Sequence, residues 1–229
     1  MVDPGPALPQ AGSKTIHAGL RLLEILRDHP DGLTITELVR VAGLHRNAVS
    51  RHLTALGSHR LIARTGTTYA LGLGIVELNA AVQHRLRGAA AAELQVLADT
   101  CQATAFITVL DADDQAVVLT ALEPRGSNIH VAYRAGNRHP ADHGASGIAI
   151  LLGRPPRPGE RAVIGQARSI GYSVTTGELQ NGAWGLAAPI ITRGRPAEAS
   201  VGVVTIGQRD ETIIAPPVLA TASKIALLL

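Results

Sequence analysis

Residues 34–71 read TITELVRVAGLHRNAVSRHLTALGSHRLIARTGTTYAL, and the order of structural signals in this stretch decides the fold of the N-terminal part of the chain. Thr34 and Glu37 have the spacing of a capping box, in which the hydroxyl and the carboxylate satisfy free backbone N–H groups at the start of a helix. Gly43 tolerates the left-handed conformation that ends a helix, so a first helix is expected over 35–41. A second helix and a small β-ribbon are expected to follow.

The second helix, expected over about 46–56, has one apolar face and one polar face. Its apolar side chains recur at i, i+4 and i+7 and are Val49, Leu53 and Leu56. At roughly 100° per residue, the polar side chains of Asn47, Arg51 and Thr54 point away from the apolar face. Ser50 lies on the flank between the two faces. Arg, Asn and Ser side chains hydrogen-bond to base edges in the DNA major groove. We therefore interpret the stretch as a winged helix-turn-helix in which Asn47, Ser50 and Arg51 contact bases.

The distribution of charge supports a nucleic-acid interface here. No Asp or Glu lies between Glu37 and Glu77, but the interval holds five arginines and three histidines: Arg40, Arg46, Arg51, Arg60, Arg64, His45, His52 and His59. Residues 1–72 carry eight Lys and Arg against five Asp and Glu, whereas residues 73–229 carry 13 of each. The alternative is a basic, solvated helix pair in some other α domain. A surface that faces phosphates must avoid carboxylates, and this favours DNA binding.

The β-ribbon is expected to form the wing. Two short strands, 62–64 and 68–71, flank a turn at 65–67. Side chains near the turn would contact phosphates or the minor groove, unless the hairpin only buttresses the helices. The expected DNA contacts are Thr34, Arg46, Asn47, Ser50, Arg51, Arg64 and Thr67.

The composition is that of an ordinary globular protein of 229 residues, 46% hydrophobic and 17% charged. No apolar run is long enough to span a bilayer, so no membrane partner is expected. Residues 1–12 lack the basic and apolar regions of a signal peptide and are expected to be a disordered tail. The lone Cys101 excludes a disulfide within the chain and fits a reducing cytoplasm. We expect it to be a buried, inert thiol.

Beyond the ribbon, the pattern predicts an α+β protein with two domains. Helices are expected at 13–28, 75–87, 89–100, 146–152, 160–169 and 217–229. In the first of these, the helical period predicts a buried face of Ile16, Leu20, Leu23 and Leu26 or Arg27. Strands are expected at 104–110, 116–122, 129–133, 172–175, 184–191 and 200–206, with a loop at 135–145. This grouping is typical of a mainly antiparallel sheet with helices at its ends. The expected domains are a winged helix-turn-helix over 13–72, a linker helix within 73–88 and a second domain over 89–229. Two DNA modules on a near-palindrome need a dimer, and the linker helix is the expected contact.

Motifs that would carry catalysis are absent or incomplete, so no enzyme activity, cofactor or metal is expected. The chain has no Gly-x-Ser-x-Gly elbow, phosphate loop or dinucleotide fingerprint. Four residues of types that bind zinc lie near one another: His130, His139, Asp142 and His143. His139, Asp142 and His143 occupy loop sequence rather than i and i+4 of a helix, which favours surface or capping roles. Gly144-Ala145-Ser146-Gly147 lacks a partnered base and is not expected to be a nucleophile motif.

Several short motifs together resemble the IclR family of bacterial transcription regulators over about residues 13–207. They are the helix-turn-helix 33–61, YALG at 69–72, RAG at 134–136 with Pro140, SG at 146–147, GYSV at 171–174 and LAAPI at 186–190. The resemblance implies a winged helix-turn-helix joined by a linker helix to a GAF-like effector-binding domain. It also implies a homodimer or dimer of dimers, and control of DNA binding by a small molecule. The protein is accordingly interpreted as a cytoplasmic regulator, a repressor or an activator, of a double-stranded DNA operator.

The chain departs from the family pattern in the pocket that the resemblance implies. Where the family commonly has a Cys, this chain has Gly185, and where it has an acidic residue, this chain has Thr175 or Thr176. Two common serines are replaced by Gly202 and Val204, a His by Asp142 and a Lys by Ile148. The segment 153–169 is also shorter than in the family. The polar groups that hold a small carboxylate in relatives are thus largely missing, and a buried anion without donors costs several kcal/mol. We expect a larger, less polar ligand; the alternative is a regulator that has lost small-molecule binding.

Two features of the expected pocket remain to be assigned. Backbone N–H groups at the start of a helix could donate to a ligand, and Trp184 could stack on an apolar ligand or fill the core. The expected effector-binding residues are Asp142, Gly144, Ala145, Ser146, Thr175, Ala183, Trp184, Gly185, Gly202 and Val204. A rival from another class is a ligand-sensing or scaffolding protein whose winged helix binds protein. The carboxylate-free basic stretch argues against it.

Overall fold

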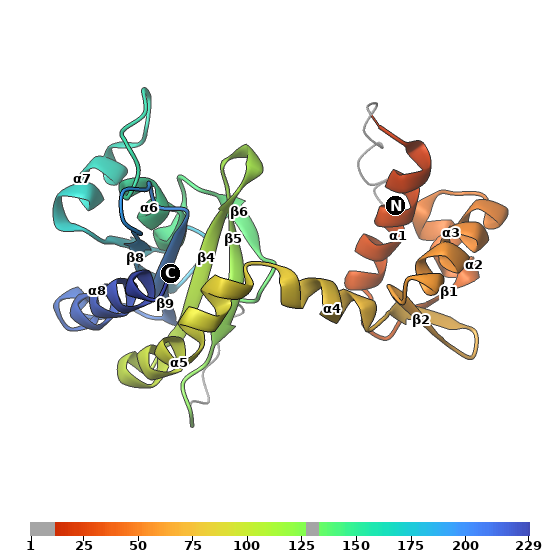
Figure 1. Ribbon diagram of the computed structural model, residues 1–229, viewed down its shortest axis with the longest axis horizontal. Helices are drawn as coiled ribbons and strands as arrows, with labels where there is room; N and C mark the ends of the chain where they lie inside the picture. Colours follow the sequence, from red (N-terminus) through yellow and green to blue (C-terminus); the bar gives the residue numbers. More distant parts are fainter. Residues whose placement is uncertain (1–11, 127–132) are drawn as a thin grey trace. The chain divides into compact units, whose positions relative to one another are not determined.

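The computed structural model describes residues 12–126 and 133–229, and the chain divides into two compact units, 1–83 and 84–229. Figure 1 shows the elements of each unit. Each unit has its own hydrophobic core. Among the described residues, none of the helices combines the length and the hydropathy that crossing a bilayer requires. The expected tail at 1–12 lies almost wholly outside the described residues.

The N-terminal unit consists of helices around a small antiparallel sheet. Its elements are α1 (Lys14–Arg27), β1 (Leu33–Thr34), α2 (Ile35–Ala42), α3 (Arg46–Ser58), β2 (Ile62–Thr65), β3 (Thr68–Leu71) and α4 (Gly74–Ala81). The sheet has the order β1-β3-β2, so the wing has a third strand that the sequence did not predict. The fully buried side chains of the core include Leu22, Leu26, Leu38 and Val49.

The expected start of the helix-turn-helix is confirmed. The Thr34 hydroxyl accepts from the Glu37 N–H at 3.3 Å, and the Glu37 carboxylate accepts from the Thr34 N–H at 2.8 Å. Gly43 ends α2 with φ +65°, in the left-handed region where a residue without Cβ is unstrained. These caps fix the turn from which α3 departs.

The buried face of α1 differs from the expected one. The residues expected to lie inward include Ile16 and Leu20, but these are 63% and 49% exposed. Leu26 of the expected face is buried and Leu23 packs partly buried against the core, while Ala18 and Leu22 take the places expected for Ile16 and Leu20. The buried stripe is thus rotated around the helix relative to the expected one. Ile16 and Leu20 remain as exposed apolar side chains.

Two glycines join the wing closely to the end of α3. Gly72 donates its N–H to the Leu61 carbonyl at 2.8 Å, and Gly74 donates to the Arg60 carbonyl at 2.8 Å. A Cβ at Gly74 would lie 2.8 Å from the carbonyl oxygens of both His59 and Arg60, and a Cβ at Gly72 would lie 2.8 Å from the Ile62 carbonyl carbon. Only glycine permits this approach of backbone to backbone.

The single linker helix expected over 75–87 is interrupted. Helix α4 ends at Ala81, Val82 is extended, and Gln83 has φ +50°. Helix α5 (His84–Cys101) then continues through the residues expected at 89–100. A left-handed residue cannot propagate an α-helix, so the apolar periodicity runs across two separate helices.

The C-terminal unit is a six-stranded antiparallel sheet with helices on both faces. Its strands are β4 (Thr104–Asp111), β5 (Gln115–Leu122), β6 (Arg138–Pro140), β7 (Ser173–Thr176), β8 (Ala183–Ile190) and β9 (Ala199–Ile206), in the order β6-β5-β4-β9-β8-β7. The other elements are α5, the 3₁₀ turn η1 (Ala112–Asp114), α6 (Gly144–Leu152), α7 (Ala162–Ile170) and α8 (Glu211–Leu227). The α+β prediction is confirmed.

Alternation along the strands divides this unit into two cores. One face of the sheet packs against α5 and α8 through residues such as Ile107, Leu186 and Val203. The other face packs against α6 and α7 through Phe106 and Ala187. Figure 1 shows these helix pairs on opposite sides of the sheet. Because side chains alternate along a strand, neighbours in sequence enter different cores.

Two expected boundaries in this unit were wrong. The loop at 135–145 contains β6, which pairs with β5 through Gln115 and Pro140. Helix α8 begins at Glu211 rather than 217, because Asp210 caps it by accepting from the Thr212 N–H at 2.9 Å. Two prolines, at 216 and 217, lie within α8. The strand expected at 129–133 lies almost entirely outside the described residues.

Candidate functional site

The polar face of α3 is exposed and stands opposite the buried face. Val49 and Leu53 lie in the core of the N-terminal unit. Asn47, Ser50 and Arg51 are exposed, and within the described residues none of these three side chains makes a hydrogen bond. The face therefore presents an amide, a hydroxyl and a guanidinium to solvent.

Two expected contacts next to this face already have partners. The Arg46 guanidinium at the start of α3 donates to the Thr36 hydroxyl at 3.4 Å and remains exposed. The Thr34 hydroxyl donates to the Glu37 carboxylate at 2.8 Å, as well as accepting from the Glu37 N–H. The Thr34 side chain is thus committed to the helix cap, which makes it a positioning group for α2 rather than an exposed phosphate contact.

The tip of the wing carries Arg64 and Thr67, which are both exposed. Arg64 donates through Nε to the Gly66 carbonyl at 2.8 Å, and its guanidinium carbon lies 5.5 Å from the centre of the Tyr69 ring. These contacts hold the guanidinium at the tip. At the base of the wing, Arg60 pairs with Glu77 at 2.8 Å, so one arginine of the basic stretch is neutralised.

The C-terminal unit contains a cavity of about 300 Å³. It lies between the α6 face of the sheet and the loop that joins β7 to β8. Its lining combines apolar and polar side chains: Phe106, Tyr133, Asn137, Arg138, His139, Ala145, Ser146, Thr175, Glu178, Leu179, Gln180, Ala183, Gly185 and Val204. Six of the expected effector-binding residues belong to this set: Ala145, Ser146, Thr175, Ala183, Gly185 and Val204.

The other four expected residues do not line the cavity. Trp184 is buried on the opposite face of the sheet, in the core with α5 and α8, because it alternates with Ala183 and Gly185 along β8. Gly202 lies under the Phe106 ring, since a Cβ there would come within 2.7 Å of Phe106 Cζ. Asp142 pairs with His143 at 2.7 Å outside the cavity, and Gly144 contributes only its backbone nearby.

One polar network on the cavity wall joins Tyr133, Ser146 and His139. His139 Nδ1 lies 2.9 Å from the Pro140 carbonyl, which can only accept, so Nδ1 carries the proton. His139 Nε2 then accepts from the Ser146 hydroxyl at 3.0 Å, and the Tyr133 hydroxyl donates to Ser146 Oγ at 2.8 Å. Burial lowers the pKa of His139 and raises the pKa of Tyr133, which keeps both rings neutral at neutral pH.

This network gives Ser146 the partner that its sequence context lacked. It does not assemble a hydrolytic site, because the first backbone N–H groups of α6 point to other partners and supply no oxyanion hole. The Gly144 N–H donates to Glu178 at 2.7 Å, and the Ala145 N–H donates to Thr175 Oγ1 at 3.0 Å.

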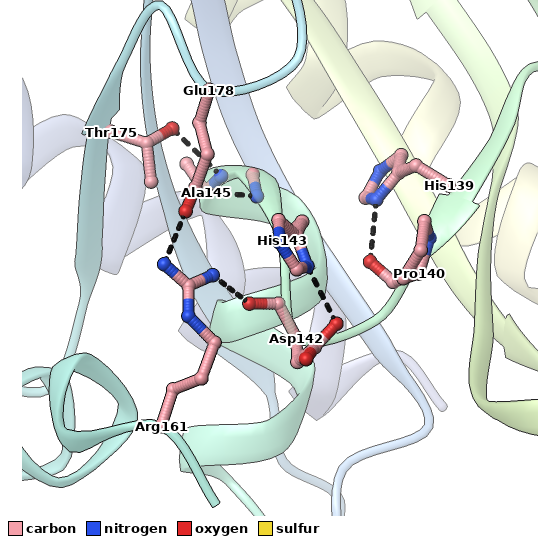
Figure 2. A network of polar contacts seen from close by, with 9 residues as sticks. His139, Pro140, Asp142, His143, Ala145, Arg161, Thr175 and Glu178 are labelled. Atoms are coloured by element: carbon pink, nitrogen blue, oxygen red, sulfur yellow. Dashed lines mark hydrogen bonds and ion pairs between the residues drawn. The ribbon is translucent and has the colours of Figure 1, made fainter.

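A second network surrounds Glu178, which the sequence analysis did not single out. Figure 2 shows the Glu178 and Thr175 side chains above the start of α6, with Arg161 below. Arg161 Nη2 contacts Glu178 Oε1 at 2.5 Å, and its Nη1 donates to the Asp142 carbonyl. The only signal in the sequence was a lone Glu in the short TTGELQNG connection. Two of the helix-end N–H groups expected to receive a ligand, those of Gly144 and Ala145, are therefore occupied by the protein itself.

Local contacts account for His139 and His143, and burial accounts for Cys101. His139 and His143 make separate contacts, with Pro140 and Asp142 respectively, as Figure 2 shows. Within the described residues, no group of three or more His, Cys, Asp or Glu side chains is arranged to hold a metal ion. His130 lies outside those residues. Cys101 is a free, buried thiol, and burial raises its pKa to about 11.

Comparisons of sequence with known proteins agree on one family. Residues 16–66 match the family model described as the IclR helix-turn-helix domain. The chain is similar to the HTH-type transcriptional regulator Rv1719 of Mycobacterium tuberculosis, with 29% identity over 154 residues. This match covers 66% of the chain and 59% of the relative, so the chain spans less than two thirds of that protein.

Comparisons of structure give the same fold over nearly the whole chain. An IclR homolog from Microbacterium hydrocarbonoxydans, complexed with 4-hydroxybenzoate, has a TM-score of 0.81 and 20% identity, covering 94% of this chain and 99% of that one. An IclR transcriptional regulator from Alicyclobacillus acidocaldarius has a TM-score of 0.79 and 20% identity, covering 95% and 99%. At these identities the likeness establishes the fold alone.

Proposed function

Because the chain belongs to the IclR family, we propose that it is a transcription regulator that binds DNA sequence-specifically and responds to a small molecule. The observation that carries the proposal is the exposed polar face of α3. Its amide, hydroxyl and guanidinium stand beside the wing, in a stretch from which carboxylates are missing between Glu37 and Glu77.

In the proposed mechanism, α3 enters the major groove. Asn47, Ser50 and Arg51 hydrogen-bond to base edges and supply sequence preference. Arg46 and the wing residues Arg64 and Thr67 contact the phosphate backbone or the minor groove and fix the register. A cytoplasmic location follows from this role.

The proposed effector site is the cavity between α6 and the sheet. Its volume suits a compact organic molecule, and a relative of the same fold is complexed with 4-hydroxybenzoate. An effector shifts operator affinity only by its difference in affinity for the DNA-binding and the non-binding arrangement. We propose repression as the default role, relieved or strengthened by the effector.

The proposed assembly is a homodimer or a dimer of dimers. Exposed apolar side chains support it, because α1 presents Ile16 and Leu20, and α4 presents Val76 and Leu78. Apolar groups gathered on exposed helices are typical of association surfaces. Two copies would also supply the two α3 helices that a near-palindromic operator needs. Sedimentation velocity at micromolar concentration tests this, and a monomer would contradict it.

The deciding experiment is fluorescence anisotropy of the purified protein with the duplex immediately upstream of its own gene. The titrations run from about 50 to 200 mM salt, with unrelated DNA as competitor. Arg51→Ala should weaken specific binding by about 1–3 kcal/mol and leave the fold intact. Arg193→Ala removes the same charge from an exposed position in the C-terminal unit and should leave affinity unchanged.

Two results would contradict the proposal. Unchanged operator affinity in Arg51→Ala would remove the base-contact role of α3. Failure to bind DNA at low salt, together with no retention on heparin, would indicate a winged helix that binds protein.

A further inference from the structure

We propose that the cavity of the C-terminal unit binds an uncharged ligand bearing a hydrogen-bond donor, and rejects carboxylates, because the Glu178 carboxylate already occupies the start of α6. The inference rests on the effector role proposed above and specifies the chemical class of the effector. Four observations carry it: the occupied helix end, the paired arginine, the charge of the lining and the direction of the hydroxyl network.

The start of α6 is the natural anion site of this cavity, since a helix N-terminus presents unpaired N–H groups and a positive dipole end. Here its first two N–H groups already have partners within the protein. Glu178 Oε2 accepts from the Gly144 N–H at 2.7 Å, and Thr175 Oγ1 accepts from the Ala145 N–H at 3.0 Å. A ligand carboxylate would have to displace an internal carboxylate to reach these donors.

The Glu178 carboxylate is held from a second side. Its Oε1 contacts Arg161 Nη2 at 2.5 Å, and the Arg161 guanidinium also donates to the Asp142 carbonyl. The Glu178 side chain is only 19% exposed, so displacing it would strip a half-buried arginine of its counter-charge. Figure 2 shows Arg161 directed at Glu178. This arrangement opposes exchange of Glu178 for a ligand anion.

The rest of the described lining offers a carboxylate no unpaired positive charge. Arg138 is the only Arg or Lys among the lining residues, and it pairs with Asp111. His139 is neutral and uses both ring nitrogens, one with Pro140 and one with Ser146. A ligand anion would face Glu178 without compensation, and like charges a few Å apart repel strongly in a partly buried site.

The cavity wall formed by Tyr133, Ser146 and His139 offers hydrogen-bond acceptors rather than donors to a ligand. The Ser146 hydroxyl donates its hydrogen to His139, and the Tyr133 hydroxyl donates its hydrogen to Ser146. The Tyr133 oxygen therefore keeps a lone pair that can accept a hydrogen bond from a ligand.

The apolar lining completes the specificity. Phe106, Leu179 and Val204 contribute apolar surface between the polar groups. A ligand that suits this cavity therefore has an apolar body with amide or hydroxyl groups. Its N–H or O–H hydrogens would reach the acceptors on Glu178 and Tyr133.

Isosteric pairs of probes test this class directly. Benzoate and benzamide, and 4-hydroxybenzoate and 4-hydroxybenzamide, differ only in replacing a carboxylate by an amide of the same shape. Isothermal titration calorimetry at pH 7.5 with the full-length protein should give the amide at least about tenfold tighter binding in each pair that binds. Equal binding of acid and amide, tighter binding of the acid, or binding of neither member of both pairs would overturn the proposal.

Glu178→Gln removes the charge while keeping an acceptor for the Gly144 N–H. In this variant the preference should reverse, with the acid gaining at least about tenfold, because Arg161 loses its counter-charge. Glu160→Gln is the matched control: Glu160 pairs with Arg168 at 2.7 Å, is 21% exposed and does not line the cavity, so selectivity should not change. Unchanged selectivity in Glu178→Gln, confirmed as folded by thermal melting, also overturns the proposal. Calorimetry measures ligand binding without DNA, and anisotropy measures DNA binding. A failure of the ligand-class proposal can therefore be told apart from a failure of the proposed regulatory function.

Discussion

Gly202 is the position at which the structure makes its sharpest energetic prediction. It lies in β9, directly opposite Ala187 of β8, and neither it nor the neighbouring strand glycine Gly185 has a positive φ. A Cβ on Gly202 would lie 2.6 Å from Ala187 Cβ and 2.7 Å from Phe106 Cζ, and closer still to the Leu186 carbonyl oxygen. A Cβ on Gly185 would meet nothing nearer than Ala145 Cβ at 3.5 Å. The two glycines therefore form a matched pair.

Gly202→Ala should be destabilising and Gly185→Ala should not. Overpacking of a rigid core costs typically about 1–3 kcal/mol, and here two of the three contacts belong to paired strands that cannot move independently. Loss of glycine freedom in the unfolded chain offsets about 0.4–1 kcal/mol in both variants. The expected net changes in the free energy of unfolding are a loss of about 1–2 kcal/mol for Gly202→Ala, and a gain of up to about 1 kcal/mol for Gly185→Ala.

Urea unfolding followed by the fluorescence of the single tryptophan provides the assay. Trp184 lies in the core of the C-terminal unit, so its signal reports on that unit without contribution from the other. The comparison uses midpoints at unchanged slope. A Gly202→Ala protein as stable as the parent, or a Gly185→Ala protein that loses as much, would refute the contact argument. The same contacts would exclude the serine that the family resemblance places at this position.

Two further predictions concern a helix cap and a thiol. Thr34→Ala removes the hydroxyl of the capping box and should destabilise the N-terminal unit by about 1 kcal/mol. The α2 amides should then exchange their hydrogens faster with solvent. Unchanged exchange rates would contradict the capping role. Burial raises the pKa of Cys101 from 9.0 to about 11, so its contribution to stability is complete below pH 9 and is lost as pH rises toward 11. Urea unfolding at pH 8 and pH 10.5 should show this loss in the parent and a smaller one in Cys101→Ala, and equal losses would argue against it. At pH 8 the folded protein should also react slowly with iodoacetamide compared with the urea-unfolded protein.

Local signals predicted most of the elements. The capping box at Thr34 and the glycine at 43 are short-range features, and they place α2 and α3 correctly. Strand-like apolar runs likewise predicted β4, β5, β8 and β9. The wrong predictions fall where several local conformations or buried faces fit the sequence equally well and tertiary contacts select one of them. In α1 the core takes Ala18 and Leu22 in place of the equally periodic Ile16 and Leu20. At Gln83 a left-handed residue interrupts a continuous periodic pattern.

The cavity was predicted in outline but not in its chemistry. Motif order brought Ala145, Thr175 and Gly185 to the same place, as the structure does. Of the two roles expected for Trp184, stacking on a ligand or filling the core, the structure shows the second, because alternation along β8 directs its side chain away from the cavity. Glu178 was missed because its role depends on a contact across 34 residues, from a loop whose path has no sequence signature. A long-range hydrogen bond from backbone to side chain leaves no periodic trace.

The backbone contacts of Gly72 and Gly74 have a mechanical consequence. No side chains separate the strand that leaves the wing from the end of α3, so the two segments touch through backbone atoms alone and cannot shift easily against each other. A rotation of α4 should therefore move α3 and the wing together as one rigid body. A larger residue at either position would clash with this backbone and force it away, so α4 would no longer be held directly against the end of α3.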